Sequence, residues 1–317
     1  GEDMNVVIGH NAGGAIRHDD SHDNVIIGKD AGAGGAASLQ NCVIIGESAM
    51  DSTGANAVDG EVAIGKDALG GMTTGRHNVA IGLSAMKESI QGEKNVVIGY
   101  TAMDESGVST FTDATCDYND GTTITHDANA NIVQGLYVTG SGIPNLSYIT
   151  SITDSTHFVI NNTTTGGNKV NQTLTFYVEP RETVAIGYGS LGGDWSSGAV
   201  YDNTAVGCNT MSAALNGASK NTALGNRALS SSTTPHNNTM VGWHAGWQLT
   251  SGDENTAVGS NAMAGVVTGD NNVAMGFNAA LALTSGEQNT ILGKDAGAAI
   301  TTTSNCVLMG YKAGEDI

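Results

Sequence analysis

The stretch Asn255-Thr256-Ala257-Val258-Gly259 is the unit from which most of this chain is built. The same order, an Asn, a Val or Thr, two apolar residues and a Gly, recurs at Asn78-Val79-Ala80-Ile81-Gly82 and at Asn289-Thr290-Ile291-Leu292-Gly293. The glycines that close the copies are Gly9, Gly28, Gly46, Gly65, Gly82, Gly99, Gly187, Gly207, Gly225, Gly242, Gly259, Gly276, Gly293 and Gly310. Neighbouring glycines lie 17 to 20 residues apart, except for one gap of 88 between Gly99 and Gly187. Fourteen copies in phase predict a solenoid in which each repeat forms one coil.

The apolar triplet of each copy has the properties of a short strand. Its first residue is Val or Thr in all fourteen copies, and both are β-branched residues that favour strands. All three positions are apolar or Thr, whereas a strand with one wet face would alternate. We therefore expect both faces of the strand to be buried. One face packs inside the coil of the chain itself, and the other must be covered by something else.

Other repeat positions predict the shape of the coil. The closing glycine ends the strand, where a positive φ or a close backbone approach is required. Three residues later Ala fills all but two copies, the exceptions being Ser190 and Thr210, which indicates a tight corner inside the coil. The Asn that opens the unit either bonds its own backbone or stacks into a ladder along the coils. A helix is excluded because glycine recurs too often.

These features predict an all-β fold, a parallel β-roll or β-solenoid of about 14 coils. One coil buries too few side chains to offset the entropy of ordering it, so stability must come from stacking on its neighbours. At about 4.8 Å per coil the rod is roughly 65 Å long.

The repeat is absent from residues 107–181. This segment holds seven of the fifteen aromatic residues and is rich in Thr, Asn and turn signals such as Asn119-Asp120-Gly121. Short β-branched runs at sandwich-like spacing predict a small inserted β-sandwich-like domain. The chain is thus divided into coils one to six (1–106), the insert (107–181) and coils seven to fourteen (182–317). Insertions on solenoids often carry binding, so Tyr118, Tyr137 and Tyr148 are candidate binding residues; a simple spacer is the alternative.

Composition excludes several classes of partner. Lys and Arg number 12 against 31 Asp and Glu, which gives a formal charge of −19. Nucleic acids and anionic membrane surfaces need clustered cations, so neither is an expected partner. No apolar run approaches the roughly 20 residues that span a bilayer, and we find no signal peptide. Glycine supplies 45 of the 317 residues, about twice its ordinary share.

Motifs for catalysis and cofactor binding are missing. The sequence has no nucleophile elbow, phosphate loop, zinc-protease helix or paired-cysteine motif, so we expect no enzyme and no cofactor. A solenoid enzyme would need a cluster of polar catalytic groups. Cys42 and Cys306 share a repeat position but lie too far apart to bond within one chain. A meeting of equivalent cysteines across a trimer axis is the alternative, and a buried small apolar side chain is the favoured role for the pair.

Two local clusters are candidate sites. The loop His18-Asp19-Asp20-Ser21-His22-Asp23 carries competent metal ligands, His18, Asp20, His22 and Asp23, that threefold symmetry would gather around an axis. A solvated acidic loop without metal is the favoured interpretation. Trp243 and Trp247 occur in one coil, where they either stack against sugars or partners, or form a local packing pair.

The repeats Asn41-Cys42-Val43-Ile44-Ile45-Gly46 and Asn305-Cys306-Val307-Leu308-Met309-Gly310 resemble the head repeats of trimeric autotransporter adhesins and the repeat arrays of phage tail fibres. The resemblance covers about three quarters of the chain. It implies a left-handed roll assembled as a homotrimer, which would cover the second apolar face. The coiled-coil stalk and membrane anchor of the autotransporters are not seen, which favours a fibre or filament.

Two functions follow from this interpretation. The first is a structural segment of an extracellular or virion-surface fibre, a rigid rod that presents the insert to a cell-surface glycan or protein receptor. The alternative is a self-assembling filament subunit, because residue 317 followed by residue 1 would place the next closing glycine 16 residues on, nearly in phase.

Overall fold

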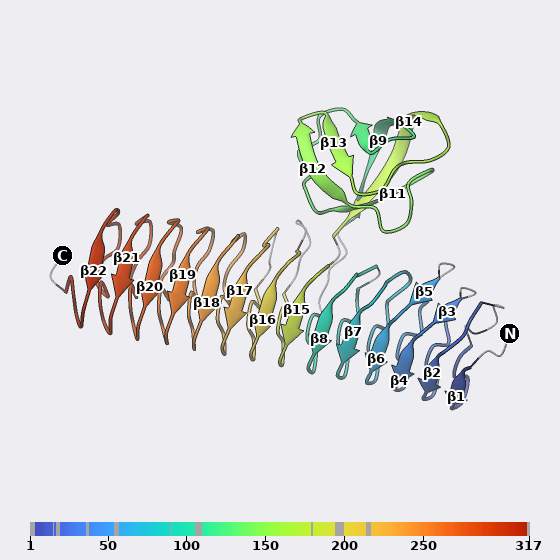
Figure 1. The fold of residues 1–317 in the computed structure, drawn as a ribbon, viewed down its shortest axis with the longest axis horizontal. Coiled ribbons are helices and arrows are strands. Elements are labelled where there is room, and N and C mark those ends of the chain that lie inside the picture. The colour runs from blue at the N-terminus through green and yellow to red at the C-terminus, as the bar shows by residue number, and fades with distance from the viewer. Residues whose placement is uncertain are drawn as a thin grey trace.

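The computed structural model describes residues 4–14, 16, 20–35, 38–53, 57–89, 91–104, 110–178, 180–193, 200–213 and 217–315. These residues form strands, turns and loops, and no helix occurs among them. Figure 1 shows a long stack of coils with a second, smaller body standing off one side of it. The prediction of an all-β parallel solenoid is confirmed.

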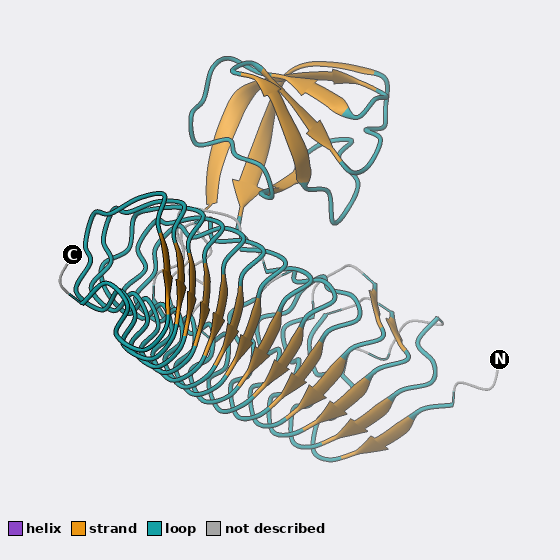
Figure 2. Ribbon diagram, turned by 60° about the vertical axis from the view of Figure 1, so that its left-hand side comes forward, coloured by secondary structure: helices purple, strands orange, loops and turns teal. Residues whose placement is uncertain are grey.

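The apolar triplets are the strands of one 14-stranded parallel sheet. In spatial order these strands are β1 (Val6–Ile8), β2 (Val25–Ile27), β4 (Val43–Ile45), β6 (Val62–Ile64), β7 (Val79–Ile81), β8 (Val96–Ile98), β15 (Val184–Ile186), β16 (Thr204–Val206), β17 (Thr222–Leu224), β18 (Thr239–Val241), β19 (Thr256–Val258), β20 (Val273–Met275), β21 (Thr290–Leu292) and β22 (Val307–Met309). They lie side by side in one row (Figure 2). A shorter sheet pairs β3 (Leu39–Gln40) with β5 (Val58–Asp59).

The insertion does not disturb the register of the stack. Strand β8 pairs directly with β15, so Val96 lies beside Val184 and Ile98 beside Ile186. Coil seven therefore follows coil six in space as closely as any other pair of coils, and the long sheet is continuous.

Each strand divides its side chains between the inside and the outside of the coil. In the 14-stranded sheet, the middle residue of each strand from β2 to β21, such as Ala257 or Ile291, is fully buried. The alanine three residues after the closing glycine is buried as well, as at Ala262, which fits the tight corner expected there. The first and third strand residues point outward and are half-buried in most strands. A single chain thus shelters one face of the sheet only.

The closing glycines are required by the distance between coils. Gly259 has φ +137°, and a Cβ on it would lie 2.4 Å from the carbonyl oxygen of Gly276. Every closing glycine from Gly9 to Gly293 has such a contact with the glycine of the next coil. Any side chain here would push two coils apart, because real Cβ atoms do not approach this closely.

The opening asparagines form a ladder along the coils, which decides between the two alternatives that the sequence left open. Asn272 donates to Asn255 Oδ1 from its backbone N at 2.9 Å and from Nδ2 at 3.0 Å, and Nδ2 also donates to the Gly286 carbonyl at 2.9 Å. These side chains are buried, so the ladder satisfies polar groups that would otherwise be costly.

One rung of the ladder is a carboxyl group. Glu61 occupies the asparagine position, is fully buried, and accepts hydrogen bonds from Asn78 N at 3.0 Å and Asn78 Nδ2 at 3.1 Å. Burial raises the pKa of Glu61 to about 8, against the opposing effect of these two hydrogen bonds. A protonated carboxyl has nearly the shape of an amide, so it fits the ladder in its neutral form.

Residues 110–177 form a second sheet that is antiparallel. Its strands are β9 (Thr110–Asn119), β10 (Thr123–Thr125), β11 (Tyr137–Thr139), β12 (Ile149–Asp154), β13 (His157–Ile160) and β14 (Asn168–Tyr177), in the spatial order β11-β14-β9-β10-β13-β12. Tyr148, just before β12, bridges back to Tyr137 on β11. The sheet therefore closes on itself, where the sequence predicts two facing sheets. Register shifts between the long strands β9 and β14 let them bend around a shared core that includes Phe158 and Phe176.

We predict that Gly293→Ala destabilises the protein much more than Gly310→Ala. Both glycines have a positive φ, +133° and +121°, so both variants bear a similar backbone strain of about 1–3 kcal/mol. Only at Gly293 does the new Cβ meet the carbonyl oxygen of the next coil, at 2.4 Å, whereas nothing lies within 4 Å of it at Gly310. Denaturant unfolding followed by circular dichroism measures both; equal losses would contradict the spacing argument.

We also predict that Glu61→Gln removes a pH dependence of stability. The pKa of Glu61 is raised from 4.5 to about 8 in the folded protein, so the folded state holds a proton that the unfolded chain has released. The free energy of unfolding therefore falls as pH rises from about 4.5 to about 8, by on the order of 5 kcal/mol. Glu61→Gln lacks this fall and is the more stable protein at pH 8. Denaturant unfolding at several pH values measures how the free energy of unfolding depends on pH. Glu287→Gln, at an exposed position, is the control and should keep the pH dependence of the wild-type protein.

Candidate functional site

The outward face of the long sheet is a continuous apolar surface of two columns. The first column consists of Val and Thr, the residues that begin the fourteen strands. The second column, at the third position of each strand, consists of Ile8, Ile27, Ile45, Ile64, Ile81, Ile98, Ile186, Val206, Leu224, Val241, Val258, Met275, Leu292 and Met309. Neither column holds a charged or amide side chain. The two columns run along all fourteen strands, roughly 65 Å at 4.8 Å per strand, and a contiguous apolar surface of this kind indicates an interaction surface.

Aromatic side chains extend this surface at the residue that follows the closing glycine. Tyr100 and Tyr188 occupy this position in adjacent coils and stack with ring centroids 5.6 Å apart. Both are exposed, at 52% and 54%. Phe277 is also exposed, and the Lys294 ammonium lies 5.9 Å from its ring centroid. These positions vary from coil to coil and include polar residues, so the two strand columns are the constant part of the surface.

Trp243 and Trp247 belong to one stack with a histidine between them. The His244 ring lies 3.6 Å from the Trp243 ring and 5.0 Å from the Trp247 ring, centroid to centroid. Burial and the nearby Arg227 charge lower the pKa of His244. Trp243 is exposed and Trp247 partly buried. The pair packs locally, and Trp243 presents the only strongly exposed ring of this stack.

The candidate tyrosines of the insert lie inside it or at its base. Tyr118 and Tyr137 are buried, Tyr118 donates to the Ser141 carbonyl, and Tyr137 stacks on Tyr177 at 5.6 Å. Neither ring is available to a ligand that approaches from outside. Tyr148 is half-buried, and its ring is covered by the Arg181 guanidinium at 3.8 Å. These rings fill the space between strands, which a linear sequence does not reveal.

Arg181 joins the insert to the solenoid. Its guanidinium lies between the Tyr148 ring of the insert, at 3.8 Å, and the Tyr201 ring of the next coil, at 4.7 Å. Tyr177 adds a second link by donating its hydroxyl hydrogen bond to Gln91 Oε1 of coil five. Together these contacts form the mount of the insert. Sequence analysis missed Arg181 and Tyr201, because nothing in their spacing signals a contact with Tyr148.

The candidate metal ligands are only partly placed. His18 and Asp19 lie outside the described residues. His22 Nδ1 lies 2.9 Å from Asp23 Oδ2, both side chains are about 40% exposed, and the backbone carbonyl of Asp20 accepts from Gln40 Nε2. Within the described ranges no three His, Cys, Asp or Glu residues gather as a metal site would require. Of the free cysteines, Cys42 is buried in the asparagine ladder, where burial raises its pKa to about 12, and Cys306 is partly buried.

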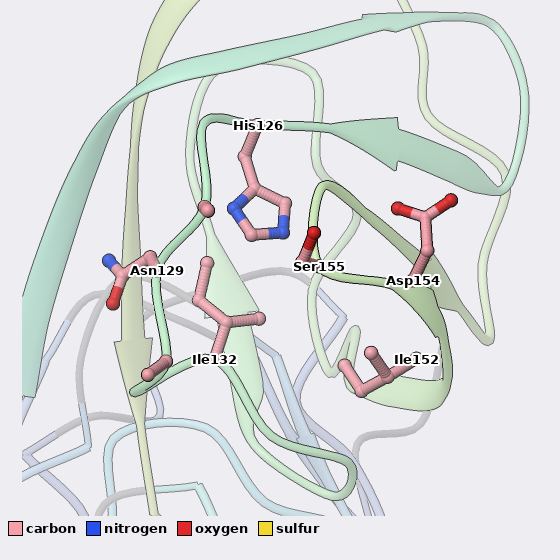
Figure 3. Close-up of a pocket in the computed structure, with 8 residues that line it drawn as sticks. His126, Asn129, Ile132, Ile152, Asp154 and Ser155 are labelled. Atoms are coloured by element: carbon pink, nitrogen blue, oxygen red, sulfur yellow. The ribbon is translucent and has the colours of Figure 1, made fainter.

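A pocket of about 340 Å³ opens in the insert, and sequence analysis missed it. Its walls come from the segment after β10, from the end of β12 and from the turn that follows it: His126, Ala128, Asn129, Ala130, Ile132, Ile152, Asp154 and Ser155. In Figure 3 the His126 ring lies between Asn129 and Ser155, with Ile132 and Ile152 facing each other below it. Aliphatic walls with a few polar groups are typical of small-ligand sites.

Comparisons of the chain with family models, with curated proteins and with solved structures return no match. The described part of the chain contains no helix that is long and apolar enough to cross a membrane.

We predict that Arg181→Ala loosens the insert while leaving the coils intact. The substitution removes two cation–π contacts, each worth about 1–2 kcal/mol when the cation is shielded from water. Amide hydrogen exchange should accelerate in residues 110–178 but not in β16–β21, and small-angle scattering should show a wider range of insert positions. Arg76→Ala is the matched control, since Arg76 holds the same coil position but is exposed; an identical response of both variants would contradict the role of the mount.

Proposed function

We propose that this chain is a structural, non-enzymatic rod whose outward sheet face is covered by sister chains in a homotrimer. The observation that supports it is the pair of charge-free columns that run along all fourteen strands. Water contact along such a face is unfavourable by about 25 cal/mol for each Å² of apolar surface, so a stable assembly buries it.

A second copy of the same chain is the partner that fits this face best. The columns repeat at the spacing of the coils, and only another solenoid of equal rise can keep its side chains in phase with them over the whole length. Around a threefold axis each sheet meets two neighbours, so the Val/Thr column faces one copy and the Ile/Leu column the other. The resemblance to trimeric adhesin heads and phage tail-fibre repeats agrees with this arrangement.

The interior of the coils supports a mechanical role. The buried asparagine side chains between Asn203 and Asn289 hydrogen-bond to one another and to backbone carbonyls along the stack. Such groups stiffen the rod and are not free for catalysis. We propose that the rod belongs to an extracellular or virion-surface fibre.

The insert is proposed as the part that meets a receptor. It stands off one side of the stack (Figure 1), and the mount ties it to the coil of Tyr201 through Arg181 and to coil five through Gln91. A rod that holds such a body away from its axis presents it to a cell-surface glycan or protein. End-to-end stacking into a filament stays a prediction from the sequence.

We predict a solution mass of three times the 32.1 kDa of one chain. Light scattering and native mass spectrometry measure it directly. Replacing Ile64, Ile81 and Ile98 with Asp places three charges on the outward face and should dissociate the assembly, because burying an unpaired charge costs several kcal/mol. The control is Val170→Asp, at an exposed position on β14 of the insert, which should leave the mass unchanged. A folded wild-type monomer at micromolar concentration would overturn the trimer.

A further inference from the structure

The pocket of the insert is built around a buried histidine–carboxylate pair. The side chains of His126 and Asp113 are 3% and 4% exposed, and His126 Nδ1 lies 3.9 Å from Asp113 Oδ2. Asp113 accepts hydrogen bonds from Thr115 N at 2.9 Å, Thr115 Oγ1 at 2.7 Å and Asn129 Nδ2 at 3.1 Å. Burial opposes ionisation of Asp113, but these hydrogen bonds together with His126 lower its pKa, so the carboxylate is charged.

The charged Asp113 lies on the Nδ1 side of the imidazole, but the 3.9 Å between Nδ1 and Oδ2 exceeds a hydrogen bond, and Nδ1 is a buried atom with no hydrogen-bond partner among the described residues. We assign the N–H of the neutral tautomer to Nδ1, because the nearby negative charge favours it there, and this leaves the lone pair on Nε2. No hydrogen bond to His126 Nε2 exists among the described residues, and in Figure 3 this edge of the ring points toward Ser155 and the space above the two isoleucines. The pocket therefore contains a fixed hydrogen-bond acceptor.

A second acceptor lies on the other side of the pocket. Asp154 accepts from Thr156 N at 2.8 Å, Thr156 Oγ1 at 2.9 Å and His157 Nδ1 at 2.9 Å through its Oδ1 atom. The hydrogen bond from His157, followed by those from Thr156, lowers the pKa of Asp154 to about 2. This carboxylate is charged at any physiological pH, and its side chain is half exposed.

The remaining lining is aliphatic. Ala128, Ala130, Ile132 and Ile152 form the walls, and the lining includes no Lys, no Arg and no Phe, Tyr or Trp ring. An anion would meet the Asp154 carboxylate and no Lys or Arg side chain in this lining. The complementary ligand has a short aliphatic stem and a positively charged group that donates hydrogen bonds.

We propose that this pocket binds an alkylammonium group, with the stem between Ile132 and Ile152 and the ammonium donating to the Asp154 carboxylate and to His126 Nε2. A lysine side chain of a protein receptor and an amino sugar with a free amine both offer this chemistry, since each joins an apolar body to an ammonium. The site lies within residues 126–155, so the proposal does not require the trimer.

Binding of n-butylamine to the 317-residue chain at pH 7, where the amines of all the probes are largely protonated, tests the proposal. We expect saturable shifts of the Ile132 and Ile152 methyl resonances, and at least tenfold weaker binding of n-butanol, which lacks the charge. Nα-acetyl-lysine methylamide and glucosamine then distinguish the two sources of the ammonium. No shifts with n-butylamine, or equal affinity for n-butanol, would overturn the proposal.

Matched variants assign the two parts of the ligand. Asp154→Asn should weaken n-butylamine binding at least tenfold, whereas Asp120→Asn, an exposed carboxylate of the insert outside the pocket, should change it less than twofold. Ile152→Ser should weaken binding about fivefold, and Val170→Ser, at a position on β14 that is also exposed, should not. Hydrogen exchange of the insert confirms that each variant is folded. Unchanged affinity in both Asp154→Asn and Ile152→Ser would place the ligand elsewhere and refute the site.

Discussion

The close approach of successive coils is the constraint on which the rest of this structure depends. Each closing glycine from Gly9 to Gly293 faces the carbonyl of the next one at a distance that leaves no room for a Cβ atom. Parallel strand pairing, the buried alanine corner and the asparagine ladder all require the same coil-to-coil alignment. A residue that breaks the alignment at one position therefore disturbs the pairing at the others, and stability is shared between neighbouring coils rather than held by any one of them.

The insertion shows how a stack of this kind accommodates a second domain. The chain leaves after β8 and returns at β15, and these two strands still pair in register. The inserted sheet is joined end to end by the bridge between Tyr137 and Tyr148, so its strands pair with one another and not with the strands of the coils. Its attachment depends on a few aromatic and polar contacts around Arg181, which are separate from the hydrogen bonds of the stack.

The same alignment generates the surface to which we assign the proposed assembly. Because equivalent residues lie directly above one another, a preference at one repeat position becomes a column along the rod. Valine and threonine in one column, and larger aliphatic residues in the next, produce a face without charge whose spacing a second copy reproduces. The proposed pocket, by contrast, does not arise from repetition. Its polar groups belong to the inserted sheet, and each of them occurs once in the chain.

The sequence by itself determined the coils: the glycine spacing, the β-branched first residue and the uniform apolar triplet predict parallel strands, one per repeat, because these properties depend on residues close together in the chain. It also located the break in the repeat, from the gap of 88 residues between Gly99 and Gly187. Only the tertiary structure decided that the asparagines form a ladder, that the inserted sheet closes, and that Tyr118 and Tyr137 point inward. Likewise, only folding brings Asp113 to His126 and Arg181 to Tyr148. These outcomes depend on packing between residues distant in sequence, for which no local pattern encodes the partner.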